Sequence, residues 1–221
     1  MISRQNALSE KEFSKEMKKS NQKVLRLCYI ALFTAIICAI SQLPGIPMPG
    51  GVPMTLQTLI IPLAGIILGP LDGFIATLLY VLLGACGVPV FSGFSGGIGV
   101  ILGATGGFII SFPLMPLMAG AGEVCGRKKG KAVYFTFIYI GLVLGAVLNY
   151  LVGTLWFAAV YLGAVNSTNM IAGFTACVAP FIVTSIIKVV LCGMMGVIIR
   201  KALTKAGLLD PKILTKPQKT Y

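Results

Sequence analysis

Long apolar stretches alternate with short polar segments along most of this chain. A run of about 17 or more apolar residues is long enough to cross a bilayer as a helix. The second and third runs are shorter and are interrupted by Pro62, Pro70 and Gly84, so tilted, kinked or partly re-entrant forms stay open for them. The pattern predicts an all-α integral membrane protein, a bundle of six transmembrane helices. The six runs are Leu27–Leu43, Leu56–Gly69, Gly73–Val88, Gly96–Ala119, Ala132–Leu162 and Ile171–Ile199.

The placement of charge supports this topology. Hydrophobic residues make up 57% of the chain and charged residues only 11%, which excludes soluble classes. Basic residues gather before the first run, between the fourth and fifth runs, and after the sixth. Six crossings put all three clusters on one side, which the positive-inside rule makes cytoplasmic, together with both termini. The predicted organisation is a polar segment at 1–23, a membrane domain at 24–205 and a basic tail at 206–221.

The net charge of +12 comes from these basic clusters beside the membrane, where we expect membrane lipids to be their partners. It is therefore no evidence that the protein binds nucleic acid. The first apolar run carries no convincing cleavage site for a signal peptidase, so we interpret it as a retained helix.

Lys188 is the one charge within the last apolar run. It lies twelve residues before Arg200, about 18 Å along a helix, too far for its side chain to reach the interface. A charge at the bilayer centre costs roughly 3 kcal/mol and indicates a functional site. Asp72 and Glu123 fall at predicted helix ends, which leaves no carboxylate for Lys188 within the membrane. The sequence therefore predicts an anion from outside the chain as its partner.

Two further polar residues lie deep in the apolar runs. Ser185 is three residues before Lys188 and Cys192 four after it, so a helix places all three on one face. Asn149 lies deep in the fifth run, where it either contacts a ligand or bonds between helices. An ammonium, a hydroxyl and an amide together suit a small molecule with a carboxylate and hydrogen-bonding groups.

Two uncharged segments rich in proline and glycine, 43–58 and 84–97, cannot form regular helices. Irregular backbone at membrane depth is tolerated where protein buries it or where it lines a cavity. These segments therefore predict irregular loops that cap an outward-facing site, with a plain connection as the alternative for 43–58. Phe91 and Phe94, in the second segment, are candidates for stacking on a ligand ring.

Small residues recur at every fourth position in three runs. In the first run they are Ala31, Ala35 and Ala39, a face for either internal packing or docking of another membrane protein. In the fourth and fifth runs the same spacing predicts internal packing. The fourth-run set is Ser95, Gly99, Gly103, Gly107 and Ser111, and the fifth-run set is Gly141, Gly145, Asn149 and Gly153.

Catalytic and metal-binding motifs are missing from the sequence. The chain contains no histidine, its six cysteines have no ligand spacing, and no phosphate-binding loop or nucleophile motif occurs. We therefore expect no metal, no cofactor and no ATP hydrolysis. An intramembrane enzyme that uses Lys188 as a base or Schiff-base former is the less favoured alternative, and a channel or purely structural bundle is a third.

Three motifs carry a resemblance to a known family, and it extends over most of residues 26–200. They are PMTLQTLIIPLAGIILGPLDG at 53–73, YVLLGACGVPVFSGFSGG at 80–97 and GATGGF at 103–108. The chain resembles the BioY family, the substrate-binding S components of energy-coupling-factor (ECF) biotin transporters. The resemblance implies six helices in a bacterial cell membrane and a biotin site near the outer face. It also implies docking of Ala31, Ala35 and Ala39 on a transmembrane scaffold subunit driven by two ATPase subunits. The expected substrate-binding residues are Lys188, Ser185, Ser95, Phe91, Phe94, Gln57, Tyr80 and Asn149.

One position departs from the family pattern. The family usually carries an aspartate three residues before the lysine, where this chain has Ser185. A hydroxyl gives neutral hydrogen bonds, which are roughly half as strong as charge-assisted ones. High-affinity capture of biotin is the expected function, and a biotin precursor or lipoate remains an alternative substrate.

Overall fold

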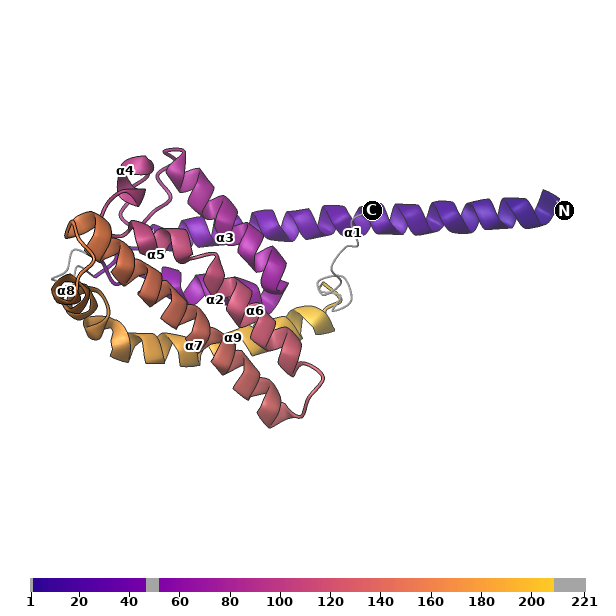
Figure 1. The fold of residues 1–221 in the computed structure, drawn as a ribbon. Coiled ribbons are helices and arrows are strands. Elements are labelled where there is room, and N and C mark those ends of the chain that lie inside the picture. Colours follow the sequence, from indigo (N-terminus) through magenta and orange to yellow (C-terminus); the bar gives the residue numbers. More distant parts are fainter. Residues whose placement is uncertain (1, 47–51, 209–221) are drawn as a thin grey trace.

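The computed structural model describes residues 2–46 and 52–208, with side chains from Ser20 onward (Figure 1). The described residues form helices joined by loops, and their only strand-like pairings are the isolated bridges Ile46–Met54 and Phe91–Ser95. The all-helical prediction is thus confirmed. The α-helices are α1 (Ile2–Ser41), α2 (Gln57–Leu68), α3 (Pro70–Ala85), α4 (Ile98–Ile101), α5 (Gly106–Ser111), α6 (Leu114–Gly126), α7 (Lys131–Trp156), α8 (Ser167–Cys177) and α9 (Ile182–Lys205).

Four helical stretches of the described chain are long and apolar enough to cross a membrane: Ser20–Ser41, Gly106–Gly126, Lys131–Tyr161 and Ser167–Lys205. The apolar helices α2 and α3, with 12 and 16 residues, are shorter than a full crossing. Six crossings are therefore not confirmed and stay a prediction. In Figure 1 the N-terminal part of α1 projects well beyond the bundle formed by the other helices.

Two predicted runs do not form single helices. The run 96–119 is divided into α4, α5 and the start of α6, with breaks at Leu102–Thr105 and at Phe112–Pro113. Its small residues, from Ser95 to Ser111, therefore do not share one helix face, and that prediction was wrong. The run 171–199 is divided between α8 and α9 by a 3₁₀ turn at Ala179–Phe181. Pro180 causes this break because it has no N–H for the helical hydrogen bond.

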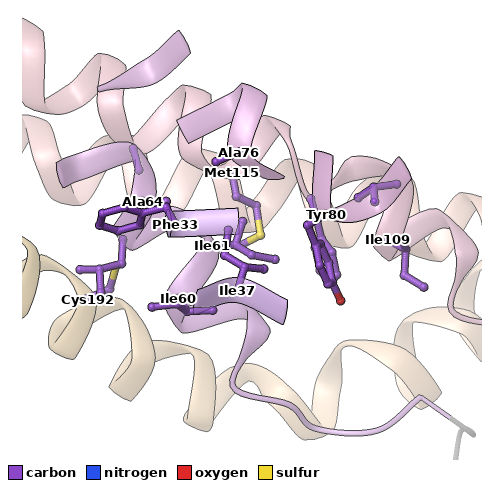
Figure 2. Close-up of a cluster of buried hydrophobic side chains, with 14 of the residues drawn as sticks. Phe33, Ile37, Ile60, Ile61, Ala64, Ala76, Tyr80, Ile109, Met115 and Cys192 are labelled. Carbon is purple, nitrogen blue, oxygen red and sulfur yellow. The ribbon is translucent and has the colours of Figure 1, made fainter. Parts of the chain in front are cut away.

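The short helix α2 lies at the centre of the bundle, in contact with α1, α3, α6, α7 and α9. Ten of its twelve residues are buried. Ile60, Ile61 and Ala64 pack among Phe33 and other core side chains (Figure 2). Gly65 lets α6 approach so closely that a Cβ at this position would lie 2.1 Å from the carbonyl oxygen of Pro116.

Buried ion pairs hold one end of the bundle. Asp72, in the first turn of α3, is 2% exposed and accepts a hydrogen bond from Arg26 Nε at 2.7 Å. Glu123, near the end of α6, is 1% exposed and pairs with Arg127 and with Arg200, whose Nε lies 3.1 Å from Oε1. The helix-end positions of both acids are confirmed. Their arginine partners, which the sequence explained by membrane topology alone, also form ion pairs within the bundle.

Arg200 also stabilises the end of α2. Its Nη1 donates to the carbonyl oxygens of Ile66 and Ile67, both at 2.6 Å. The last carbonyls of a helix have no partner within the helix, so a cation at this end satisfies them and complements the helix dipole. Arg200 thus joins α2, α6 and α9 through one side chain.

Candidate functional site

A cavity of about 260 Å³ opens between the two proline- and glycine-rich segments and the middle of the bundle. Residues 52–55, 57, 58, 91, 92 and 95 form one part of its wall. Of the predicted lid 43–58, residues 47–51 lie outside the described chain. The other walls come from α4, α5, α7, α8 and α9. The lining residues are Val52, Pro53, Met54, Thr55, Gln57, Thr58, Phe91, Ser92, Ser95, Val100, Thr105, Phe108, Ile109, Phe112, Asn149, Tyr150, Cys177, Phe181 and Lys188.

Among the described residues that line this cavity, Lys188 is the only charged one. Its Nζ donates to the carbonyl oxygen of Thr55 at 2.7 Å and to Thr58 Oγ1 at 3.1 Å. The lysine therefore has two neutral protein acceptors, which the sequence did not predict. The ion pairs of the described residues involve Arg26, Arg127 and Arg200, and none of them includes Lys188. An ammonium has three donors, so one remains for an acceptor in the cavity.

Gln57 connects the cavity wall to a buried support. Its Nε2 donates to Tyr80 Oη at 2.6 Å, and its Oε1 accepts from Thr55 Oγ1 at 2.8 Å. Tyr80 itself is fully buried, in the core cluster drawn in Figure 2. It is not among the residues that line the cavity. Its ring packs edge-on against Phe91, with 5.6 Å between the ring centroids. Gln57 and Phe91 thus line the cavity, and Tyr80 holds both from behind.

Asn149 lines the cavity and also bonds between helices. Its Nδ2 donates to the carbonyl oxygen of Phe108 at 2.9 Å and to Ser111 Oγ at 2.8 Å. The bond between helices, one of the two alternatives drawn from the sequence, is therefore confirmed. No described residue donates to Asn149 Oδ1, which leaves an acceptor available at the cavity wall.

Ser185 does not line the main cavity. It lies in a smaller adjoining cavity, which Lys188, Asn149 and Cys192 also line, so the predicted shared face of Ser185, Lys188 and Cys192 is confirmed. Its hydroxyl is hydrogen-bonded to the hydroxyl of Tyr150. Tyr150 lines both cavities and was missed from the sequence, where nothing distinguishes it from the other tyrosines.

The two phenylalanines of the second loop have different surroundings. Phe91 is 1% exposed. Its ring packs so closely on Gly84 that a Cβ added to Gly84 would lie 2.2 Å from the ring. Phe94 is 70% exposed, has a positive φ of 57° and is not part of the cavity wall. Ser95 lines the cavity, and its Oγ donates to the carbonyl oxygen of Ser92 at 2.9 Å.

The threonines Thr55 and Thr58 were also missed, although they stand in the quoted motif PMTLQT. Their proximity to a lysine 130 or more residues later is a tertiary contact that the motif does not reveal.

The alanine stripe of α1 faces away from the core. Ala31, Ala35 and Ala39 are all exposed, whereas Phe33 and Ile37 between them are buried. Internal packing, one of the two alternatives for this stripe, is thus excluded within the described bundle. The described residues also contain no group of three or more His, Cys, Asp or Glu that could hold a metal.

Known proteins are similar to this chain in sequence and in fold. The profile of the BioY family matches residues 13–205. A probable biotin transporter BioY of Pyrococcus horikoshii is 40% identical over 166 residues, which are 75% of this chain and 90% of that protein. The biotin transporter BioY of Rhodobacter capsulatus is 36% identical over 171 residues, or 76% of this chain and 88% of that one. A crystal structure of the S-component for biotin from an ECF-type ABC transporter matches with a TM-score of 0.69 and 31% identity, covering 82% of this chain and 93% of the other.

Proposed function

The chain belongs to the BioY family, and we propose that it captures biotin in the cavity beside Lys188 as the substrate-binding component of a biotin uptake system. The observation that carries this proposal is the ammonium of Lys188, whose hydrogen-bond acceptors among the described residues are two neutral oxygens, so that one donor is left for a ligand. Biotin has one carboxylate, which supplies the missing negative charge. The transporter names of the relatives favour this role over the alternative of an intramembrane enzyme.

The rest of the cavity suits the remaining parts of this ligand. Small-molecule sites have volumes of roughly 300–1,000 Å³ with mainly apolar walls, and this cavity of about 260 Å³ lies just below that range, at the size for a small ligand. Phe91 offers an aromatic surface for the fused rings. Gln57, Ser95 and Asn149 offer amide and hydroxyl groups to the polar ureido head. We assign no direct ligand contact to Phe94 and Tyr80, and Ser185 acts through Tyr150.

The proposed topology is a multi-pass protein of the cell membrane with cytoplasmic termini, in which α2 and α3 complete six crossings. Its support is that the α6–α7 turn and the end of α9 meet at one end of the bundle, where their basic residues line a common cavity. That end is the cytoplasmic side by the positive-inside rule. Ala31, Ala35 and Ala39 form the proposed docking face for a transmembrane scaffold subunit with two ATPase subunits, because small residues allow close helix approach.

Calorimetric titration of the purified protein in detergent tests the proposal, with biotin, dethiobiotin and lipoate as ligands. Tight binding of biotin alone would support it and would show that Ser185 replaces the usual acid. Preference for dethiobiotin or lipoate would mean that the fold is kept while the specificity differs. Binding of none of the three carboxylates would refute the assignment of this cavity.

A further inference from the structure

A third cavity lies at the opposite end of α9 from Lys188. It has a volume of about 570 Å³ and is enclosed by the end of α6, the α6–α7 turn and the last turns of α9. Lys201 and Lys205 lie 13 and 17 residues after Lys188, which corresponds to about 20–25 Å along the helix. We name it the basic cavity; it is lined by Glu123, Arg127, Lys129, Lys131, Tyr134, Arg200, Lys201, Thr204 and Lys205.

The charges around the basic cavity do not balance. Six of its residues are cations, and Glu123 is its one carboxylate. Glu123 is 1% exposed and is already paired with Arg127 and Arg200, so it is not available to the lysines. The four lysines of the wall form no ion pair with any residue that the structure describes. Cations that face one concave surface repel one another, and an anion bound among them relieves this repulsion.

The surface of α9 leads directly into this cavity and is apolar. Four exposed apolar residues recur along α9 at intervals of three or four positions, beginning at Ile187 and ending at Ile198. Lys201 and Lys205 follow at the same intervals. This spacing puts them on one face of the helix. The face therefore changes from apolar to cationic at the level of the basic cavity. In order along α9 its residues are Ile187, Leu191, Met194, Ile198, Lys201 and Lys205.

We propose that the basic cavity binds the phosphate headgroup of an anionic phospholipid, with an acyl chain lying along the apolar face of α9. A phospholipid has an anionic phosphate followed by hydrocarbon chains, in the same order as the cationic and apolar parts of this face. A soluble anion or an acidic peptide has no hydrocarbon chain to contact the apolar part. Lysines suit the phosphate because each offers a compact charge with three rotatable donors. The proposed orientation makes this the inner leaflet, where anionic lipids attract basic segments. The site is separate from the proposed biotin cavity.

Native mass spectrometry of the protein in a neutral detergent tests this proposal, with phosphatidylglycerol, phosphatidylcholine or inorganic phosphate added. We expect retention of phosphatidylglycerol in preference to phosphatidylcholine, which has the same phosphate but no net charge. Millimolar inorganic phosphate should not displace the lipid. Displacement by free phosphate would show that the site accepts the anion without its lipid, and equal retention of both lipids would overturn the charge argument. If neither lipid is retained, the basic cavity is free for an acidic partner and the proposal fails.

A matched pair of variants separates the cavity from general surface charge. Lys201→Gln with Lys205→Gln removes two cavity charges, and Lys23→Gln with Lys128→Gln removes two exposed charges outside the cavity. The cavity double variant should lose on the order of thirtyfold in affinity for phosphatidylglycerol, and the control pair should lose little. Equal losses in both would overturn the proposal.

Biotin titration of the same samples shows whether each variant is folded. It also tests the proposed biotin site separately, so that failure of the lipid proposal can be told apart from failure of the biotin proposal. If the cavity variant does not fold, the comparison of the three ligands on the unsubstituted protein decides the question alone.

Discussion

Replacement of Lys188 by glutamine should weaken biotin binding by about 150-fold. Glutamine keeps a polar amide donor at this position but removes the charge. The ligand carboxylate would then lie in a mainly apolar cavity without a cation. Loss of one partner of a partly desolvated charge pair costs roughly 2–5 kcal/mol. A cost of about 3 kcal/mol corresponds to the expected factor, since each tenfold change in affinity is about 1.4 kcal/mol.

Thr58→Val tests how much Lys188 contributes by anchoring residues 52–58, as distinct from binding the ligand carboxylate. Lys188 donates to Thr58 Oγ1 at 3.1 Å, and valine removes this bond while the charge and the shorter bond to Thr55 stay. A single hydrogen bond to a rotatable ammonium is worth about 1 kcal/mol, so the affinity for biotin should fall by about fivefold.

Calorimetry with biotin and the neutral biotinamide completes a double-mutant cycle between protein and ligand. The unsubstituted protein should bind biotinamide about 150-fold more weakly than biotin, while the Lys188→Gln protein should bind both ligands equally. If the substitution weakens both ligands by the same factor, Lys188 only anchors residues 52–58, and a carboxylate contact is refuted.

Three further perturbations test the docking face, the helix contacts and the buried ion pair. Ala35→Trp should leave biotin binding unchanged but lower biotin uptake by cells at least tenfold, because a bulky side chain blocks close helix approach. Gly65→Ala should lower the free energy of unfolding by about 2 kcal/mol, since its Cβ would meet the backbone of Pro116 and force α2 from α6. Arg200→Met should lower it by about 3 kcal/mol, because Glu123 then lacks a buried partner. Thermal unfolding in detergent measures the last two.

Each of these predictions has a control. Unchanged uptake by the Ala35→Trp protein, at equal amounts in the membrane, would contradict the docking face. Gly99→Ala should change stability by less than about 0.5 kcal/mol, because its Cβ would have no atom within 4 Å. Glu123→Gln added to Arg200→Met should restore part of the lost stability. If it restores none, the cost comes from the freed carbonyls of α2 and not from the buried acid.

The sequence was sufficient for the parts of the fold that depend on local transfer free energy. Apolar runs predicted helices, and the basic clusters predicted one charged end of the bundle. Both predictions work because each residue contributes its own free energy of transfer into the membrane, whichever residues lie near it in the fold. The same reasoning was wrong for the runs 96–119 and 171–199, where breaks near Pro113 and Pro180 divide the helices. A proline inside an apolar run does not show by itself whether the helix continues through it, as at Pro62, or ends.

Site residues divide in the same way. Lys188 could be found from the sequence because a charge in an apolar run is costly wherever the run lies in the fold. Its acceptors Thr55 and Thr58, and the link between Tyr150 and Ser185, join residues far apart in the chain. No local pattern predicts such pairs, since they depend on which helices meet and at what depth.

By itself, then, the sequence determined a helical membrane protein with one lysine inside its last apolar run and an alanine stripe on its first helix. Tertiary structure decided that the short helix α2 is the centre of the bundle, that the alanines face outward, and that the loops on both sides of α2 and α3 close one cavity at Lys188. The physical reason is that hydropathy measures the cost of leaving water, which is local. The pairing of polar groups depends on how closely backbones approach, and contacts such as Gly65 against Pro116 set that distance.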